Sequence, residues 1–144
     1  VTCIDLFRFG WKFTPISPVE YLYPVTSAIK YLQENMGESD RYMTLDRRIL
    51  PPNANIMYGI KTIEGYDPIY SKKYADLITK MEAGDNVYRS TNFGRIIRPA
   101  NWKSTVANQL NVKYLIGLEE INDPDVEEVF HEGQTRIYWY FTSQ

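Results

Sequence analysis

The chain has 144 residues, of which 44% are apolar and 24% are charged, and its formal net charge is -2. This length and apolar content suit a single domain with one core. The nearly balanced charge argues against a nucleic-acid-binding protein, and no window reaches the roughly 20 apolar residues that a membrane span needs. Because Cys3 is the only cysteine, an intramolecular disulfide and a cysteine-based zinc site are both excluded.

The first predicted elements precede Gly37. Residues 1–9 are β-prone and alternate in polarity, which predicts a strand in which Cys3 is a small buried hydrophobic residue. Residues 11–24 hold three prolines among aromatic side chains and predict an extended arm. A helix is expected next, with Thr26 as its N-cap and Gly37 as its stop. Its apolar positions recur at helical spacing: Val25, Ala28, Ile29, Leu32 and Met36.

The middle of the chain alternates between strand and helix patterns. Arg41 to Leu45 predicts a short strand, and Tyr58 to Ile63 predicts another. A second helix is expected to begin at Ser71 and to end at Gly84, because the intervening apolar residues fall on one helical face. Residues 85–101 show no periodicity and predict a long loop.

The last third of the chain predicts a short helix, a buried strand and a hairpin. The helix spans Lys103 to Leu110, and the dense β-formers from Val112 to Ile116 indicate a central strand. Val126 to His131 and Thr135 to Phe141 have the pattern of a hairpin. The expected fold is therefore α/β (α+β): a mixed β-sheet with two to three packed helices and a C-terminal hairpin, in a single domain over residues 1–144.

The inventory of reactive residues disfavours a self-contained catalytic centre. His131 is the only histidine, and no Gly-x-Ser-x-Gly sequence presents a nucleophile for it to activate. Phosphate-binding glycine loops are also absent from the sequence. Asp123 and Asp125 flank a proline in an acidic segment, which is the composition of an ordinary solvated turn. We therefore expect no catalytic residue, no metal site and no cofactor, and no nucleic-acid partner.

The segment from Asn53 to Pro68, called the 53–68 segment below, combines amide, phenol and carboxylate side chains with turn-forming glycines. Such groups suit a hydroxyl-rich ligand, and they equally suit internal stabilisation of a loop. Arginines of the long loop add guanidinium groups that match phosphate oxygens, with a solvated loop as the alternative. The predicted ligand-binding residues are Asn53, Asn55, Tyr58, Tyr66, Asp67, Arg95 and Arg98.

Several blocks of the sequence resemble one protein family. They are Asp5-Leu-Phe-Arg-Phe-Gly-Trp-Lys-Phe13, Leu50-Pro-Pro-Asn-Ala-Asn55, Tyr58-Gly59, Gly65-Tyr66-Asp67-Pro68, Leu110-Asn-Val-Lys-Tyr-Leu115 and Thr135-Arg-Ile-Tyr138. In this order they are similar to the YfhO-type bacterial membrane proteins, large multispanning relatives of the lipid-linked-sugar glycosyltransferases. The resemblance covers nearly the whole chain. It departs at the end, where the family continues Tyr-Glu-Asn and this chain has Tyr138-Trp-Tyr.

The resemblance implies an extracytoplasmic domain at the cell membrane, excised from a larger protein that glycosylates cell-envelope polymers such as teichoic acids. Its implied partners are the transmembrane part of that parent protein and a cell-envelope glycan or polyprenyl-phosphate sugar. Family catalysis is expected outside these residues. The expected function is thus a noncatalytic domain that binds glycan or positions the membrane catalytic core. The alternatives are a structural module without a ligand and a glycan-acting hydrolase, which would need two carboxylates about 5 to 9.5 Å apart.

Overall fold

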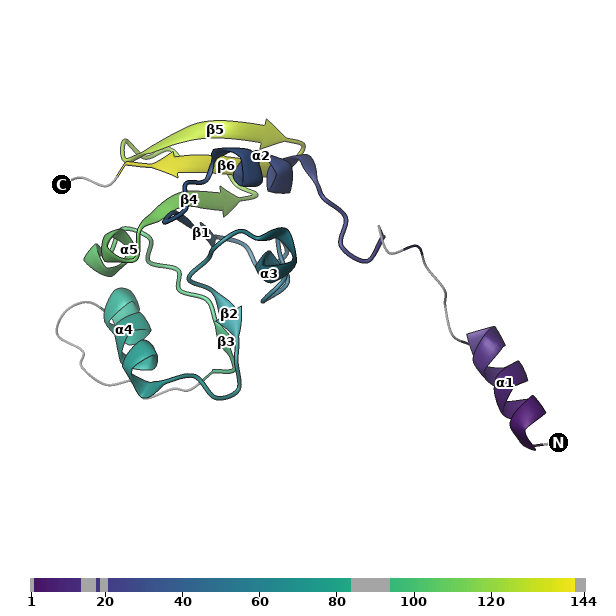
Figure 1. The fold of residues 1–144 in the computed structure, drawn as a ribbon. Helices are drawn as coiled ribbons and strands as arrows, with labels where there is room; N and C mark the ends of the chain where they lie inside the picture. Colours follow the sequence, from purple (N-terminus) through teal and green to yellow (C-terminus); the bar gives the residue numbers. More distant parts are fainter. Residues whose placement is uncertain (1, 14–17, 19–20, 84–93, 142–144) are drawn as a thin grey trace.

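The computed structural model describes residues 2–13, 18, 21–83 and 94–141. These residues form a mixed α+β fold with a four-stranded sheet, a two-stranded sheet and, within those ranges, five helices (Figure 1). The predicted fold class is confirmed.

The four-stranded sheet has the order β1-β4-β6-β5. Strand β1 (Arg41–Thr44) runs parallel to β4 (Val112–Gly117), and β6 (Thr135–Tyr140) pairs antiparallel with β4 and with β5 (Val126–Glu132). The buried central strand and the C-terminal hairpin are therefore confirmed. Strand β4 lies inside the sheet with most of its side chains buried on both faces, which explains its continuous apolar sequence.

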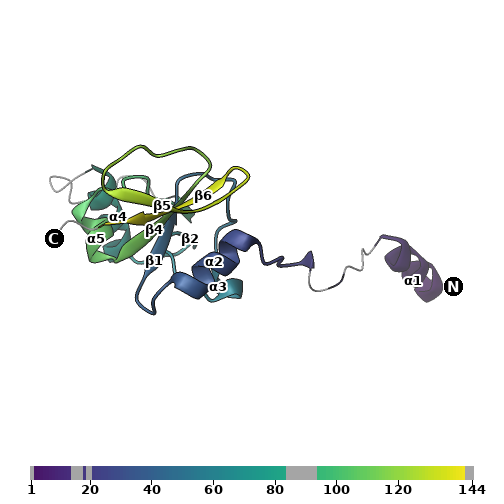
Figure 2. The ribbon, with the colours of Figure 1, turned by 90° about the horizontal axis from the view of Figure 1, so that it is seen from above.

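Helices cover both faces of this sheet. Helix α2 (Ser27–Asn35) packs on one face, while α4 (Lys72–Ala83) and α5 (Thr105–Gln109) lie on the other (Figure 2). All three predicted helices are confirmed. Thr26 accepts a hydrogen bond from the Ile29 amide at 3.3 Å and is the N-cap of α2, as predicted. The proposed stop of the second helix, Gly84, lies outside the described residues.

The predicted strand from Tyr58 to Ile63 is wrong. Residues Asn55–Tyr58 form the short helix α3, which ends at Gly59 with a left-handed φ of 69°. The residues that follow pair with β1 through an isolated parallel bridge between Tyr42 and Thr62 and do not form a regular strand. A two-stranded antiparallel sheet follows, in which β2 (Gly65–Tyr66) pairs with β3 (Ile96–Ile97). Strand β3 occupies part of the predicted long loop, and residues 85–93 of that loop lie outside the described ranges.

The predicted strand over residues 1–9 is also wrong, because helix α1 spans Thr2–Phe13. None of the described strands lies beside this segment, so a helix is the structure that satisfies its backbone hydrogen bonds internally. Cys3 is exposed on α1, contrary to the expectation of burial. The predicted arm is irregular from Pro24 to the N-cap of α2, but its first residues belong to α1. None of the described helices has the length and apolar content required to cross a membrane.

Candidate binding groove

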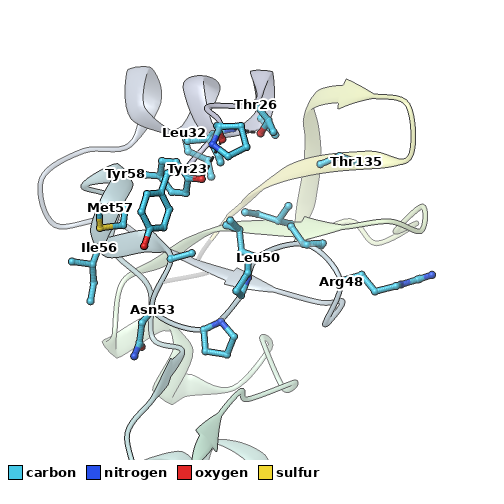
Figure 3. Close-up of a pocket in the computed structure, with 18 of the residues that line it drawn as sticks. Tyr23, Thr26, Leu32, Arg48, Leu50, Asn53, Ile56, Met57, Tyr58 and Thr135 are labelled. Atoms are coloured by element: carbon cyan, nitrogen blue, oxygen red, sulfur yellow. Dashed lines mark hydrogen bonds between the residues drawn. The ribbon is translucent and has the colours of Figure 1, made fainter. Parts of the chain in front are cut away.

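An apolar groove of about 830 Å³ lies between α2, α3 and the loop that follows β1 (Figure 3). It is called the groove below. Its volume falls within the range that suits small ligands or an inserted peptide segment. It is lined by Leu22, Tyr23, Pro24, Thr26, Ala28, Ile29, Leu32, Arg48, Ile49, Leu50, Pro51, Pro52, Asn53, Ala54, Ile56, Met57, Tyr58, Ile116, Leu118, Glu132 and Thr135.

The groove has a buried floor and an exposed rim. Leu32 of α2 and Ile116 of β4 form part of the floor and belong to the packed core of this face of the sheet. The rim consists of large apolar side chains that are mostly exposed: Leu22, Tyr23, Ile56 and Met57. Exposed apolar side chains gathered around a concavity are typical of an interaction site.

The charged side chains at the edge of the groove already have partners within the chain. Arg48 is bonded to Asp46 through Nη2 to Oδ2 at 2.7 Å and through Nε to Oδ1 at 2.9 Å. These hydrogen bonds lower the pKa of Asp46 to about 2. On the other side, the Ser27 hydroxyl donates to Glu132 at 3.0 Å. Figure 3 shows the Arg48 side chain directed away from the groove. The surface offered to an occupant is therefore chiefly apolar.

Two asparagines of the 53–68 segment hold the loop beside the groove through their side-chain amides. Asn53 donates from Nδ2 to the Tyr66 carbonyl at 2.8 Å and accepts from the Tyr66 amide through Oδ1 at 2.9 Å. Its φ is 68°, a left-handed conformation that asparagine tolerates better than most residues. Asn55 donates from Nδ2 to the carbonyl of Ile60 at 3.1 Å. Each side-chain amide thus bonds to backbone groups on the other side of a turn.

The other members of the 53–68 segment contact the backbone in a similar way. The Tyr58 hydroxyl donates to the Pro24 carbonyl at 3.1 Å, and its ring packs edge-on against Tyr23 with centroids 6.5 Å apart. Asp67 Oδ1 accepts from the Ile69 amide at 2.8 Å, which is an Asx turn. Tyr66 is held through its backbone by Asn53, and its own side chain is partly exposed.

The two predicted arginines lie in different environments. The exposed Arg95 contacts the segment through its backbone carbonyl, which accepts from the Asp67 amide at 3.0 Å. Arg98 is 16% exposed and lies 3.7 Å through Nε from Oε2 of Glu64. Its Nη2 donates to the Leu50 carbonyl at 3.3 Å, so Arg98 connects Glu64 to the loop that lines the groove. The seven predicted residues therefore belong to one continuous region, but they do not converge on one cavity.

Sequence analysis missed a buried polar cluster behind the groove, centred on Glu64. The side chain of Glu64 is only 8% exposed, and Oε1 accepts from the Thr44 amide at 2.5 Å. The Thr44 hydroxyl donates to the same carboxylate. Burial raises the pKa of Glu64, whereas the hydrogen bonds from Thr44 and the charge of Arg98 act in the opposite direction. Burial also raises the pKa of the neighbouring Tyr42 hydroxyl, with a further increase from the Glu64 charge.

One sequence signal was available for this cluster. Glu64 follows Ile60 and Ile63 in a β-prone stretch, and an acid next to buried isoleucines requires a cation or several donors. Nothing in the sequence indicates that Arg98, which is distant along the chain, supplies the cation.

The acidic segment near Asp123 forms a turn, as predicted. Asp123 Oδ1 accepts from the Asp125 amide at 3.1 Å, and Lys103 forms ion pairs with both carboxylates. Within the described ranges, no group of three or more His, Cys, Asp or Glu side chains is arranged to hold a metal ion.

Comparison with known protein families, with curated proteins and with solved structures found no match for this chain. The resemblance to the YfhO-type proteins accordingly remains a prediction from sequence.

Proposed function

We propose that this chain is a noncatalytic extracytoplasmic domain of a membrane protein that glycosylates cell-envelope polymers, and that it positions the catalytic core by docking through the groove. The observation that carries this proposal is the contrast at the groove itself. Its rim is apolar and exposed, while the neighbouring polar side chains of the 53–68 segment are occupied by internal hydrogen bonds.

This contrast favours an apolar occupant over a sugar. A sugar ring needs several hydroxyl partners, and polar groups already bonded inside the fold would have to give up those bonds to provide them. An apolar segment gains instead from covering the rim, at roughly 25 cal/mol for each Å² removed from water. The positioning role is therefore supported better than the glycan-binding role at this site.

The rim can be tested in the parent protein. Met57→Asp places a charge on the rim at a largely exposed position, so the domain should fold normally while docking is weakened. We expect polymer glycosylation by the full-length protein to fall at least about tenfold, because docking that depends on apolar burial does not tolerate a desolvated charge. The matched control is Ile69→Asp, an exposed apolar position outside the groove.

Two outcomes would argue against the positioning role. One is normal glycosylation by Met57→Asp, and the other is an equal loss in Met57→Asp and Ile69→Asp. The melting temperature of each purified domain shows whether a loss of activity results from unfolding.

Glycan binding stays a second candidate, and one observation favours it. Tyr66 on β2 is partly exposed, and the exposed Arg95 directly precedes β3, the strand that pairs with β2. An aromatic side chain and a guanidinium group exposed at the same two-stranded sheet suit an anionic sugar polymer. Titration of the domain with teichoic-acid fragments should shift the NMR resonances of Tyr66 and Arg95, and Tyr66→Ala should remove the effect. If millimolar ligand leaves these resonances unmoved, this candidate fails.

A further inference from the structure

Helix α1 exposes several large apolar side chains, and none of its residues lines the groove. Phe7 is 81% exposed and Trp11 is 84% exposed, and Ile4, Leu6 and Phe9 are also mostly uncovered. Figure 1 shows α1 apart from the two sheets. A cluster of large apolar side chains of this kind marks a surface that another medium or molecule covers.

The arrangement of side chains around α1 indicates what covers it. At about 100° per residue, Ile4, Phe7 and Trp11 fall on one flank of the helix, and Leu6 and Phe9 fall on the opposite flank. Cys3 and Gly10 lie between these flanks on one side, about 20° apart, and Asp5 and Arg8 lie between them on the other side. A protein groove covers one flank of a helix, whereas lipid chains can cover both.

The polar residues of α1 specify the kind of lipid contact. Its polar residues Asp5 and Arg8 share one side, which is the pattern of a helix lying within the membrane interface. The α1 sequence holds two basic residues, Arg8 and Lys12, against the single acid Asp5, and this excess of positive charge complements anionic headgroups.

We propose that α1 lies in the plane of a membrane surface that contains anionic phospholipids, with Asp5 and Arg8 toward water and with Cys3 and Gly10 toward the acyl chains. This orientation rests on the membrane setting of the proposed function. It adds an anchor that acts independently of the groove.

Vesicle binding by the 144-residue chain tests this anchor. The probes are vesicles of equal amounts of phosphatidylcholine and phosphatidylglycerol, compared with phosphatidylcholine alone. The chain should sediment with the mixed vesicles, and Phe7→Asp should weaken binding at least about tenfold, because a buried phenylalanine contributes enough transfer free energy for that factor. The control Ile69→Asp, an exposed apolar position away from α1, should bind normally. So should Met57→Asp, which separates failure of this anchor from failure of the groove.

The orientation of α1 can be measured with nitroxide labels, since Cys3 is the only cysteine and is exposed. The chain is labelled at Cys3 and, in Cys3→Ser backgrounds, at Gly10→Cys or Asp5→Cys. If α1 lies in the membrane plane, the labels at positions 3 and 10 should lie at similar depths among the acyl chains. The label at position 5 should instead be accessible to a nickel complex in the aqueous phase. Gly10 has open space around it and accepts the substitution.

Three results would overturn the proposal. The first is no binding to either kind of vesicle; self-association that depends on α1 would then show that a second copy of the chain covers this helix. The second is binding that Phe7→Asp leaves intact. The third is label depth that follows position along the chain instead of the side of the helix, which would mean that α1 enters the bilayer end-on.

Discussion

The 53–68 segment is held in place by two kinds of chemistry. Beside the groove, the neutral amides of Asn53 and Asn55 bond to backbone groups. Behind the groove, the carboxylate of Glu64 is buried with Arg98 and Thr44. A neutral amide near solvent can be replaced by water when it is removed, whereas a buried charge that loses its partner cannot be resolvated. The two regions should therefore respond very differently to substitution.

The largest expected effect follows removal of the buried cation. Arg98→Met keeps much of the side-chain volume but leaves the Glu64 carboxylate buried without a cation. We expect the free energy of unfolding at neutral pH to fall by about 3 kcal/mol, the lower end of the range for broken buried pairs, because Thr44 still donates to the carboxylate. Urea denaturation measures this change.

Arg95→Met is the matched control, three residues earlier and exposed. It should change the free energy of unfolding by less than about 0.5 kcal/mol. Equal effects of the two substitutions would mean that the ion pair contributes nothing beyond the general role of a surface arginine.

A smaller effect is expected at the edge of the groove. Asn53→Ala removes both hydrogen bonds to Tyr66 and places alanine at a φ of 68°. Together these should lower the free energy of unfolding by about 2 kcal/mol. Asn53→Gly also removes the side-chain amide, but glycine adopts a positive φ without strain. The free energy of unfolding should therefore fall by about half as much as in Asn53→Ala. If alanine and glycine cost the same, the backbone conformation is not part of the effect.

The smallest effect is a difference in pH dependence. Burial raises the folded-state pKa of Glu64 above its ordinary value of 4.5. As pH rises from below 4.5, the unfolded chain releases this proton first, so stability falls until pH passes the folded-state pKa. Wild type should therefore lose stability over this interval relative to Glu64→Gln, which has no such proton. Denaturation at a series of pH values gives the difference, and the opposite slope would show that the folded-state pKa is not raised.

Local patterns predicted much of this fold. Helix α2 and its N-cap Thr26, the buried strand β4 and the C-terminal hairpin all follow from periodicity and turn residues within a few positions. Helix α1 could not be predicted in this way. A short run of aromatic and aliphatic residues fits a strand or a helix equally well, and the choice depends on whether a neighbouring strand is present.

The candidate site was predictable only in outline. The composition of the 53–68 segment identified it as unusual, but it did not identify the contacts made there. Asn53 is bonded to Tyr66, and Glu64 is paired with Arg98, which follows helix α4 in the sequence. The groove brings together Leu22, Leu32 and Met57, which lie on separate elements. Such long-range contacts depend on the packing of the whole fold and cannot be predicted from the local sequence.

Photo-cross-linking from the rim of the groove tests the docking role most directly. A benzoylphenylalanine residue replaces Met57 in the membrane protein that we propose as the parent of this chain. Ile69, exposed and outside the groove, is replaced in the same way as a control. We expect irradiation to link position 57, but not position 69, to the transmembrane part of the same protein. Equal cross-linking from both positions, or none from position 57, would contradict docking through the groove.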